Sequence, residues 1–99
     1  MAKTKVFTVY DSKIGLYNTP FHLLSTGEAL RGWAEIVNDP ESKICKYPED
    51  FTLFELGEYD QETGRFHNLN TPLSLGLAVQ AKYKPTTDAP LLAGIKEGN

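Results

Sequence analysis

The feature that most constrains the fold is a single helical segment, with signals at both ends, set between strand-like stretches. The S-T-G-E sequence at 25–28 has the spacing of a capping box, in which the serine side chain accepts from the backbone N–H three residues on. Apolar residues then recur at helical spacing and form one stripe, made of Ala29, Leu30, Trp33, Ile36 and Val37. Proline in the N-D-P sequence at 38–40 cannot continue the hydrogen-bond ladder. The pattern predicts a helix over residues 26–38.

The remaining apolar stretches have the composition of strands. Residues 4–10 and 51–59 are rich in β-branched and aromatic side chains, and residues 14–24 form a second, irregular strand interrupted at Pro20. Gly64 precedes a short run at 65–69, which indicates a hairpin with the preceding strand. Residues 72–80 alternate between leucine or valine and small or polar side chains, which favours a further strand, and residues 40–50 have the composition of a surface connection. We therefore expect an α+β fold with an antiparallel sheet of four to five strands, connectivity β-β-α-β-β, and the Trp33 stripe packed on one face.

Length and composition set the domain organisation. At 99 residues, division would leave pieces too small to bury a core, so we expect one α+β domain over residues 1–82. Residues 83–99 lose periodicity, which predicts a mobile C-terminal tail unless Leu91, Leu92 and Ile95 dock on a partner. A single cysteine excludes an internal disulfide and suits a reducing compartment. No signal peptide and no run of roughly 20 apolar residues is present, so neither secretion nor a membrane span is expected.

The sequence offers no recognisable catalytic set. His22 and His67 are isolated, whereas zinc needs three or four converging donors. Cys45 has neighbouring lysines but no signature that ties it to a histidine, and no glycine-rich pattern is suited to phosphate. We expect no enzyme, no metal and no cofactor.

Charge is distributed unevenly along the chain. The net charge of −3 argues against a generic polyanion binder. Residues 49–62 contain acidic side chains and no basic one, whereas residues 1–46 hold a slight basic excess. This distribution suggests a domain with one acidic and one mildly basic side.

The N-terminal half carries the residues with some promise for binding. Lys3, Lys5 and Lys13 interleave with Phe7, Tyr10 and Tyr17 on strand-like segments. Basic side chains that track phosphates, together with aromatic faces that stack on unpaired bases, are the combination used by single-strand binders. The alternative is that Phe7 belongs to the core and that Tyr10 and Tyr17 are ordinary cross-strand partners.

Several segments together resemble one protein family. They are K-V-F-T-V-Y-D-S-K (5–13), T-P-F (19–21), G-E-A-L-R (27–31), V-N-D-P (37–40), P-E-D-F-T-L-F-E-L-G-E-Y-D (48–60) and N-T-P-L-S-L-G-L-A (70–78). In this order they resemble the small nonstructural protein of gokushovirus-type microviruses, which are tailless bacteriophages with single-stranded DNA. The resemblance implies a DNA-binding protein of the host cell cytoplasm, acting in the switch of viral DNA replication to single-strand synthesis and packaging.

The leading hypothesis is thus a nonenzymatic phage protein that binds single-stranded DNA, in the form of a homo-oligomer that covers enough of the strand. The candidate contacts are physical inferences from this sequence, namely Lys3, Lys5, Tyr10, Lys13, Tyr17, Arg31, Lys43 and Lys46. The alternative is a protein-interaction factor whose acidic hairpin around residues 49–62 engages a replication or capsid protein. If DNA binds, we expect it to avoid that acidic segment.

Overall fold

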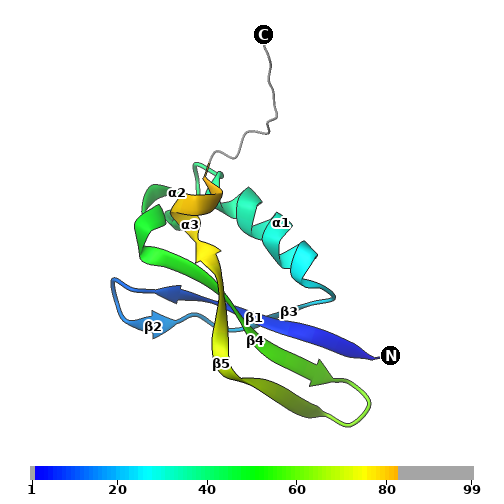
Figure 1. Cartoon of the computed structure of the whole chain (residues 1–99). Helices are drawn as coiled ribbons and strands as arrows, with labels where there is room; N and C mark the ends of the chain where they lie inside the picture. The colour runs from blue at the N-terminus through cyan, green and yellow to red at the C-terminus, as the bar shows by residue number, and fades with distance from the viewer. Residues whose placement is uncertain (1, 83–99) are drawn as a thin grey trace.

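The computed structural model describes residues 2–82 and has the predicted α+β architecture. Its strands are β1 (Lys3–Asp11), β2 (Leu16–Tyr17), β3 (Phe21–Leu23), β4 (Phe51–Asp60) and β5 (Arg65–Leu77). Its helical segments are α1 (Thr26–Val37), α2 (Lys43–Lys46), the 3-10 turn η1 (Pro48–Asp50) and α3 (Ala78–Ala81). Figure 1 shows the helices gathered on one side of a curled sheet.

The sheet is antiparallel and is built around β1. Its order is β2-β1-β4-β5, and β3 also pairs with β1. β2 and β3 therefore share one edge of β1, and residues 18–20 between them are not in a strand. This corrects the prediction of one irregular strand over 14–24, although Pro20 does lie at the interruption, as expected from its missing N–H.

The core lies between α1 and one face of the sheet. Phe7 and Val9 of β1 and Leu53 of β4 are buried against Trp33 and Val37 of α1. The predicted stripe is confirmed for Ala29, Trp33 and Val37, but Leu30 and Ile36 are exposed. Successive strand residues point to opposite faces, so the odd-numbered residues of β1 define a helix face. The even-numbered residues of β1 and their register partners define the opposite face, called here the outer face.

The capping box that predicted α1 is present in a slightly different form. The Glu28 backbone N–H donates to Ser25 Oγ at 3.2 Å, as expected. The Glu28 carboxylate accepts from the backbone N–H of Leu24 at 3.0 Å, one residue before the predicted donor. The helix ends at Val37 with Asn38 as its C-cap, within one residue of the predicted end.

Replacing Ser25 with alanine is expected to lower the free energy of unfolding by about 1 kcal/mol, because the Glu28 N–H loses its acceptor. Chemical denaturation measures the change. The Ser25→Asp variant retains an acceptor oxygen and should stay within a few tenths of a kcal/mol of the parent. Equal losses in both variants would contradict a capping role.

Residues 40–50 are more ordered than the surface connection that their composition indicated. Ser42 Oγ accepts from the backbone N–H groups of Ile44 and Cys45 and so caps α2. This short helix places Ile44 in the core cluster with Trp33. One buried residue in a four-residue helix leaves no periodic pattern, which is why residues 40–50 carry no helical signal in the sequence.

The last strand and helix also differ from the prediction. The hairpin after β4 is confirmed, with Gly64 at φ +74°. The run expected at 65–69 and residues 72–77 of the run expected at 72–80 belong to the single strand β5, and residues 78–80 belong to α3. The strand ends at Leu77 because Ala78 begins α3 and is buried in the core. The expected mobile tail, residues 83–99, lies outside the described residues.

Candidate nucleic-acid interface

A β-bulge in β4 determines which side chains share the outer face. Phe54 lies opposite Thr8, Gly57 opposite Val6 and Tyr59 opposite Thr4, so the register shifts between Val6 and Phe7. Phe54 and Tyr59 are an odd number of positions apart and would face opposite sides of a regular strand. The extra residue in the bulge brings both aromatic side chains to the outer face.

The first aromatic cluster combines β1, β2 and β4. Tyr10 and Tyr17 are register partners, and their ring centroids lie 4.7 Å apart. The Phe54 ring meets them edge-on, with centroids 5.7 Å from Tyr17 and 6.5 Å from Tyr10. Tyr17 is 51% exposed, so one ring of the cluster is available to a ligand.

The second aromatic cluster lies further along the same face. His22, Tyr59 and Phe66 come from β3, β4 and β5, and the Tyr59 and Phe66 centroids are 4.8 Å apart. The His22 ring stands edge-on to Tyr59 at 5.7 Å, and its Nδ1 lies 3.2 Å from Thr4 Oγ1. Phe66 is 57% exposed and provides a second accessible ring.

The floor between the two clusters is closely packed and uncharged. Val6 and Thr8 are buried there, and Thr8 Oγ1 donates to the Asn18 carbonyl at 2.7 Å. The carboxylates of β1 and β4 all belong to the opposite face by register, namely Asp11, Glu55, Glu58 and Asp60. The outer face therefore presents rings and hydroxyl groups without a carboxylate from either central strand.

Two of the candidate lysines lie on the helix face, among carboxylates. Lys5 Nζ lies 3.3 Å from Glu55 Oε2, and Lys5 is the register partner of Glu58. Lys3 is paired with Asp60 in the same ladder. The expected separation into an acidic and a basic side is thus wrong at this edge, because antiparallel pairing places the N-terminal lysines beside the acidic strand.

The other basic candidates lie in two places. Lys13 and Lys43 line one shallow hollow together with Asp11 and Asp50, and Lys46 is exposed on the same short helix as Lys43. Arg31 is exposed on α1, which covers the helix face. Tyr10 therefore lies beside Tyr17, and Lys13 and Lys43 line the same hollow, but the eight candidate residues do not form one site.

A family model described as Phage ORF5 protein matches residues 4–81, which is most of the chain. The chain belongs to the Phage ORF5 protein family. A curated relative, Protein ORF5 of Chlamydia phage 1, is 35% identical over 66 residues, which cover 62% of this chain and 68% of that protein. No solved structure matches. The expected resemblance to a small bacteriophage protein family is confirmed as membership of the Phage ORF5 protein family.

The described part of this Phage ORF5 protein contains neither a metal-ligand cluster nor a membrane-spanning helix. Within residues 2–82, no three or more His, Cys, Asp and Glu side chains gather to hold a metal ion. Among the helices of the same range, none is long and apolar enough to span a membrane.

The acidic hairpin of the ORF5 protein lies beside basic side chains of the neighbouring strands. The Glu62 backbone N–H donates to Asp60 Oδ1 at 2.9 Å, and this bond lowers the pKa of Asp60. Across the ladder, Asp60 is paired with both Lys3 and Arg65. This pairing weakens the case for the hairpin as a uniformly acidic docking element.

Sequence reasoning missed most of the outer face of the ORF5 protein. The sequence pattern indicated Tyr10 and Tyr17, either as DNA contacts or as ordinary cross-strand partners. It did not indicate the other four rings of the outer face, which are Phe54, His22, Tyr59 and Phe66. The aromatic residues of 51–59 were a visible signal. The bulge that aligns them was not, because it depends on pairing with β1.

Proposed function

We propose that this Phage ORF5 protein is a nonenzymatic protein that binds single-stranded DNA, in the switch to single-strand synthesis and genome packaging. The observation that carries the proposal is the outer face, where six rings form two clusters on one sheet surface. Exposed rings on a sheet are a means of stacking unpaired bases without reading their sequence. Tyr17 and Phe66 are the proposed first contacts.

The charge arrangement supports a stacking mode over a phosphate-tracking mode. Carboxylates of the central strands face away from the rings, so DNA on the outer face avoids them. Lys13, in the turn between the two tyrosine-bearing strands, is proposed to reach phosphates at the margin of the outer face. Lys43 and Lys46, on α2 beside the helix face, are proposed to reach them past this turn, although Asp11 and Asp50 share the hollow of Lys13 and Lys43. Three such contacts give a slope of log affinity against log salt no steeper than about −2.

Lys3, Lys5 and Arg31 contribute less in this arrangement. Lys3 and Lys5 project from the helix face and have carboxylate neighbours, and Arg31 is on α1. Assembly into a homo-oligomer remains part of the proposal, because joining several such faces raises the avidity for one strand.

The test is fluorescence anisotropy of a labelled oligothymidylate, with the full chain at low and moderate salt. The double variant Tyr17→Ala/Phe66→Ala is expected to bind at least about tenfold more weakly, since stacking contributes about 1–3 kcal/mol per base. Leu16→Ala is the matched control, because Leu16 is exposed on the same strand as Tyr17 and its side chain projects from the other face. It should bind as the parent does.

Charge reversal separates this mode from one based on the N-terminal lysines. The Lys3→Glu/Lys5→Glu variant is expected to change affinity only slightly, whereas Lys13→Glu/Lys43→Glu should weaken binding and flatten the salt dependence. Absence of binding by the parent at low salt would overturn the proposed function. In that case the protein-interaction alternative, with the hairpin around Asp60 as the contact, becomes the leading one.

A further inference from the structure

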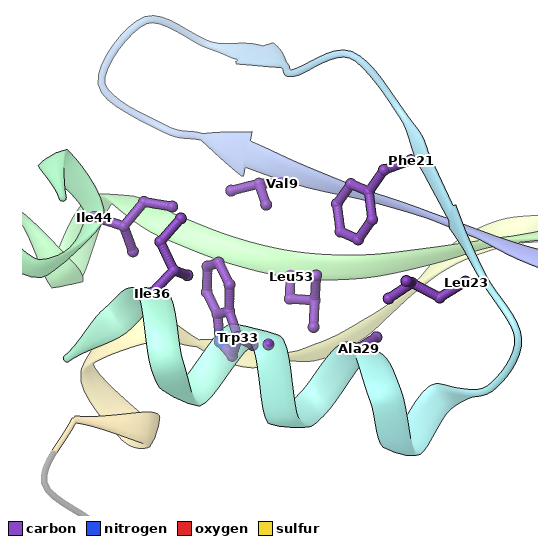
Figure 2. Close-up of a pocket in the computed structure, with 9 residues that line it drawn as sticks. Val9, Phe21, Leu23, Ala29, Trp33, Ile36, Ile44 and Leu53 are labelled. Atoms are coloured by element: carbon purple, nitrogen blue, oxygen red, sulfur yellow. The ribbon is translucent and has the colours of Figure 1, made fainter. Parts of the chain in front are cut away.

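An open apolar cavity lies between α1 and the edge of the sheet formed by β3. It has a volume of about 330 Å³, and Figure 2 shows Phe21, Leu23 and Val9 on one side and Trp33, Ile36 and Ala29 on the other. Ile44 of α2 closes one end. The side chains that line the cavity are apolar except for the indole N–H of Trp33, so water in it gains few hydrogen bonds.

The rim of this cavity is unusually apolar for a surface. Ile36 and Phe21, which line the cavity, are 42% and 37% exposed. Leu24, which follows the lining residue Leu23 in the chain, is also exposed. Adjoining apolar side chains of this kind mark a surface that is covered in the working protein. The cavity is on the helix face, so it is separate from the outer face and does not rest on the proposed DNA-binding function.

The described chain ends close to the Ile36 and Ile44 end of the cavity. Lys82 Nζ donates to the Cys45 carbonyl at 2.7 Å, and Cys45 directly follows Ile44. The Ala81 carbonyl accepts from Asn38 Nδ2 at 3.3 Å, and Asn38 is the C-cap of α1. Residue 82 is therefore held at the end of α1 that carries Ile36, which lines the cavity.

The next residues have a composition suited to crossing that short distance and filling the cavity. Residues 83–88, Y-K-P-T-T-D, are mostly polar and span at most about 20 Å when extended. Residues 89–95, A-P-L-L-A-G-I, are entirely apolar and include Leu91, Leu92 and Ile95. A spacer of this length keeps the apolar segment at a local concentration in the millimolar range, which favours its own cavity over another chain's.

We propose that Leu91, Leu92 and Ile95 of the same chain occupy this cavity and cover Trp33, Ile36 and Ile44. The segment acts as an intramolecular plug that removes the apolar rim from water. A second copy of the chain or an unrelated protein are the competing occupants, and the experiment distinguishes both from the plug.

The test uses methyl NMR on the full chain labelled at isoleucine and valine. In the Leu91→Asp/Leu92→Asp/Ile95→Asp variant, the methyl resonances of Ile36 and Ile44 are expected to shift, while those of Val6 on the outer face do not. Thr86→Asp/Thr87→Asp/Asn99→Asp adds the same charge outside the apolar segment and should leave all three unchanged. Nuclear Overhauser contacts from Ile95 to Ile36 or Trp33 are expected in the parent.

Two results would overturn the plug. Unchanged Ile36 and Ile44 resonances in the first variant would show that the segment does not occupy the cavity. Contacts from Ile95 that appear only between differently labelled chains in a mixed sample would assign the cavity to a second copy. Contacts within one chain, retained on dilution, support the proposal.

Discussion

Alanine at position 57 is expected to lower the free energy of unfolding by about 3 kcal/mol, through a strained backbone and a clash. Gly57 has φ +151°, a conformation that side chains with a Cβ rarely adopt. A Cβ there would meet the His67 carbonyl oxygen and lie 2.8 Å from Asn68 Cα, both of which are backbone atoms of the paired strand. Relief requires β4 and β5 to separate locally.

Gly32→Ala is the matched control for this substitution. Gly32 lies inside α1, and a Cβ at that position meets no atom within 4 Å among residues 2–82. Alanine should therefore stabilise the helix by about 0.5–1 kcal/mol, which is the opposite sign. Urea denaturation followed by circular dichroism measures both variants, and a Gly57→Ala protein as stable as the parent would refute the close approach of β4 and β5.

The position of Gly57 adds a functional consequence. It follows the bulge and precedes Tyr59, so separating the strands there also displaces the ring from Phe66 and His22. The Gly57→Ala variant should accordingly lose DNA affinity together with stability, whereas Gly32→Ala should lose neither.

Trp33→Ala is expected to cost about 3–5 kcal/mol, because it removes the largest side chain of the helix stripe from the core. Trp33 is only 5% exposed and packs in the cluster that includes Phe7, Leu53 and Ile44. Leu30→Ala, on an exposed part of the same helix, should cost much less. Thermal unfolding by far-ultraviolet circular dichroism compares the variants without relying on tryptophan emission.

The indole nitrogen of Trp33 refines this prediction. It is buried and has no hydrogen-bond partner within residues 2–82. Trp33→Phe keeps an aromatic ring and removes the unsatisfied N–H, whose burial costs about 1–3 kcal/mol. The phenylalanine variant should thus be far more stable than the alanine variant. If both lose the same stability, the ring contributes little to packing.

The sequence predicted those parts of the fold that depend on local chemistry. The S-x-x-E spacing and the Trp33 stripe located α1 almost to the residue, and Gly64 located the hairpin turn. The parts that failed depend on distant residues. Whether residues 72–80 continue as a strand was decided by burial of Ala78 in the core, and Ile44 had no periodic neighbours to reveal its burial.

The candidate site shows the same division between local and distant information. Tyr10 and Tyr17 were identified because they alternate with lysines on strand-like segments, and the structure pairs them directly. Lys3 and Lys5 were grouped with the tyrosines because they are close in sequence. As odd-numbered residues of β1, however, the two lysines project from the helix face, whereas Tyr10 projects from the outer face. Their acidic neighbours come from β4, whose register with β1 could not be derived from composition.

The central place of β1 in the sheet has a consequence for how the chain folds. β2 and β3 pair with β1 across short loops, but the other edge of β1 receives β4, and the Lys5–Glu55 ion pair joins residues fifty positions apart. During synthesis one hydrogen-bonding edge of β1 remains unpaired until residues 51–60, which form β4, have left the ribosome. Closure of so long a loop before its contacts form slows folding relative to a helical protein of this size. The early hairpin of β1 with β2 and β3, which satisfies one edge at once, is the part of the chain best suited to limit aggregation in that interval.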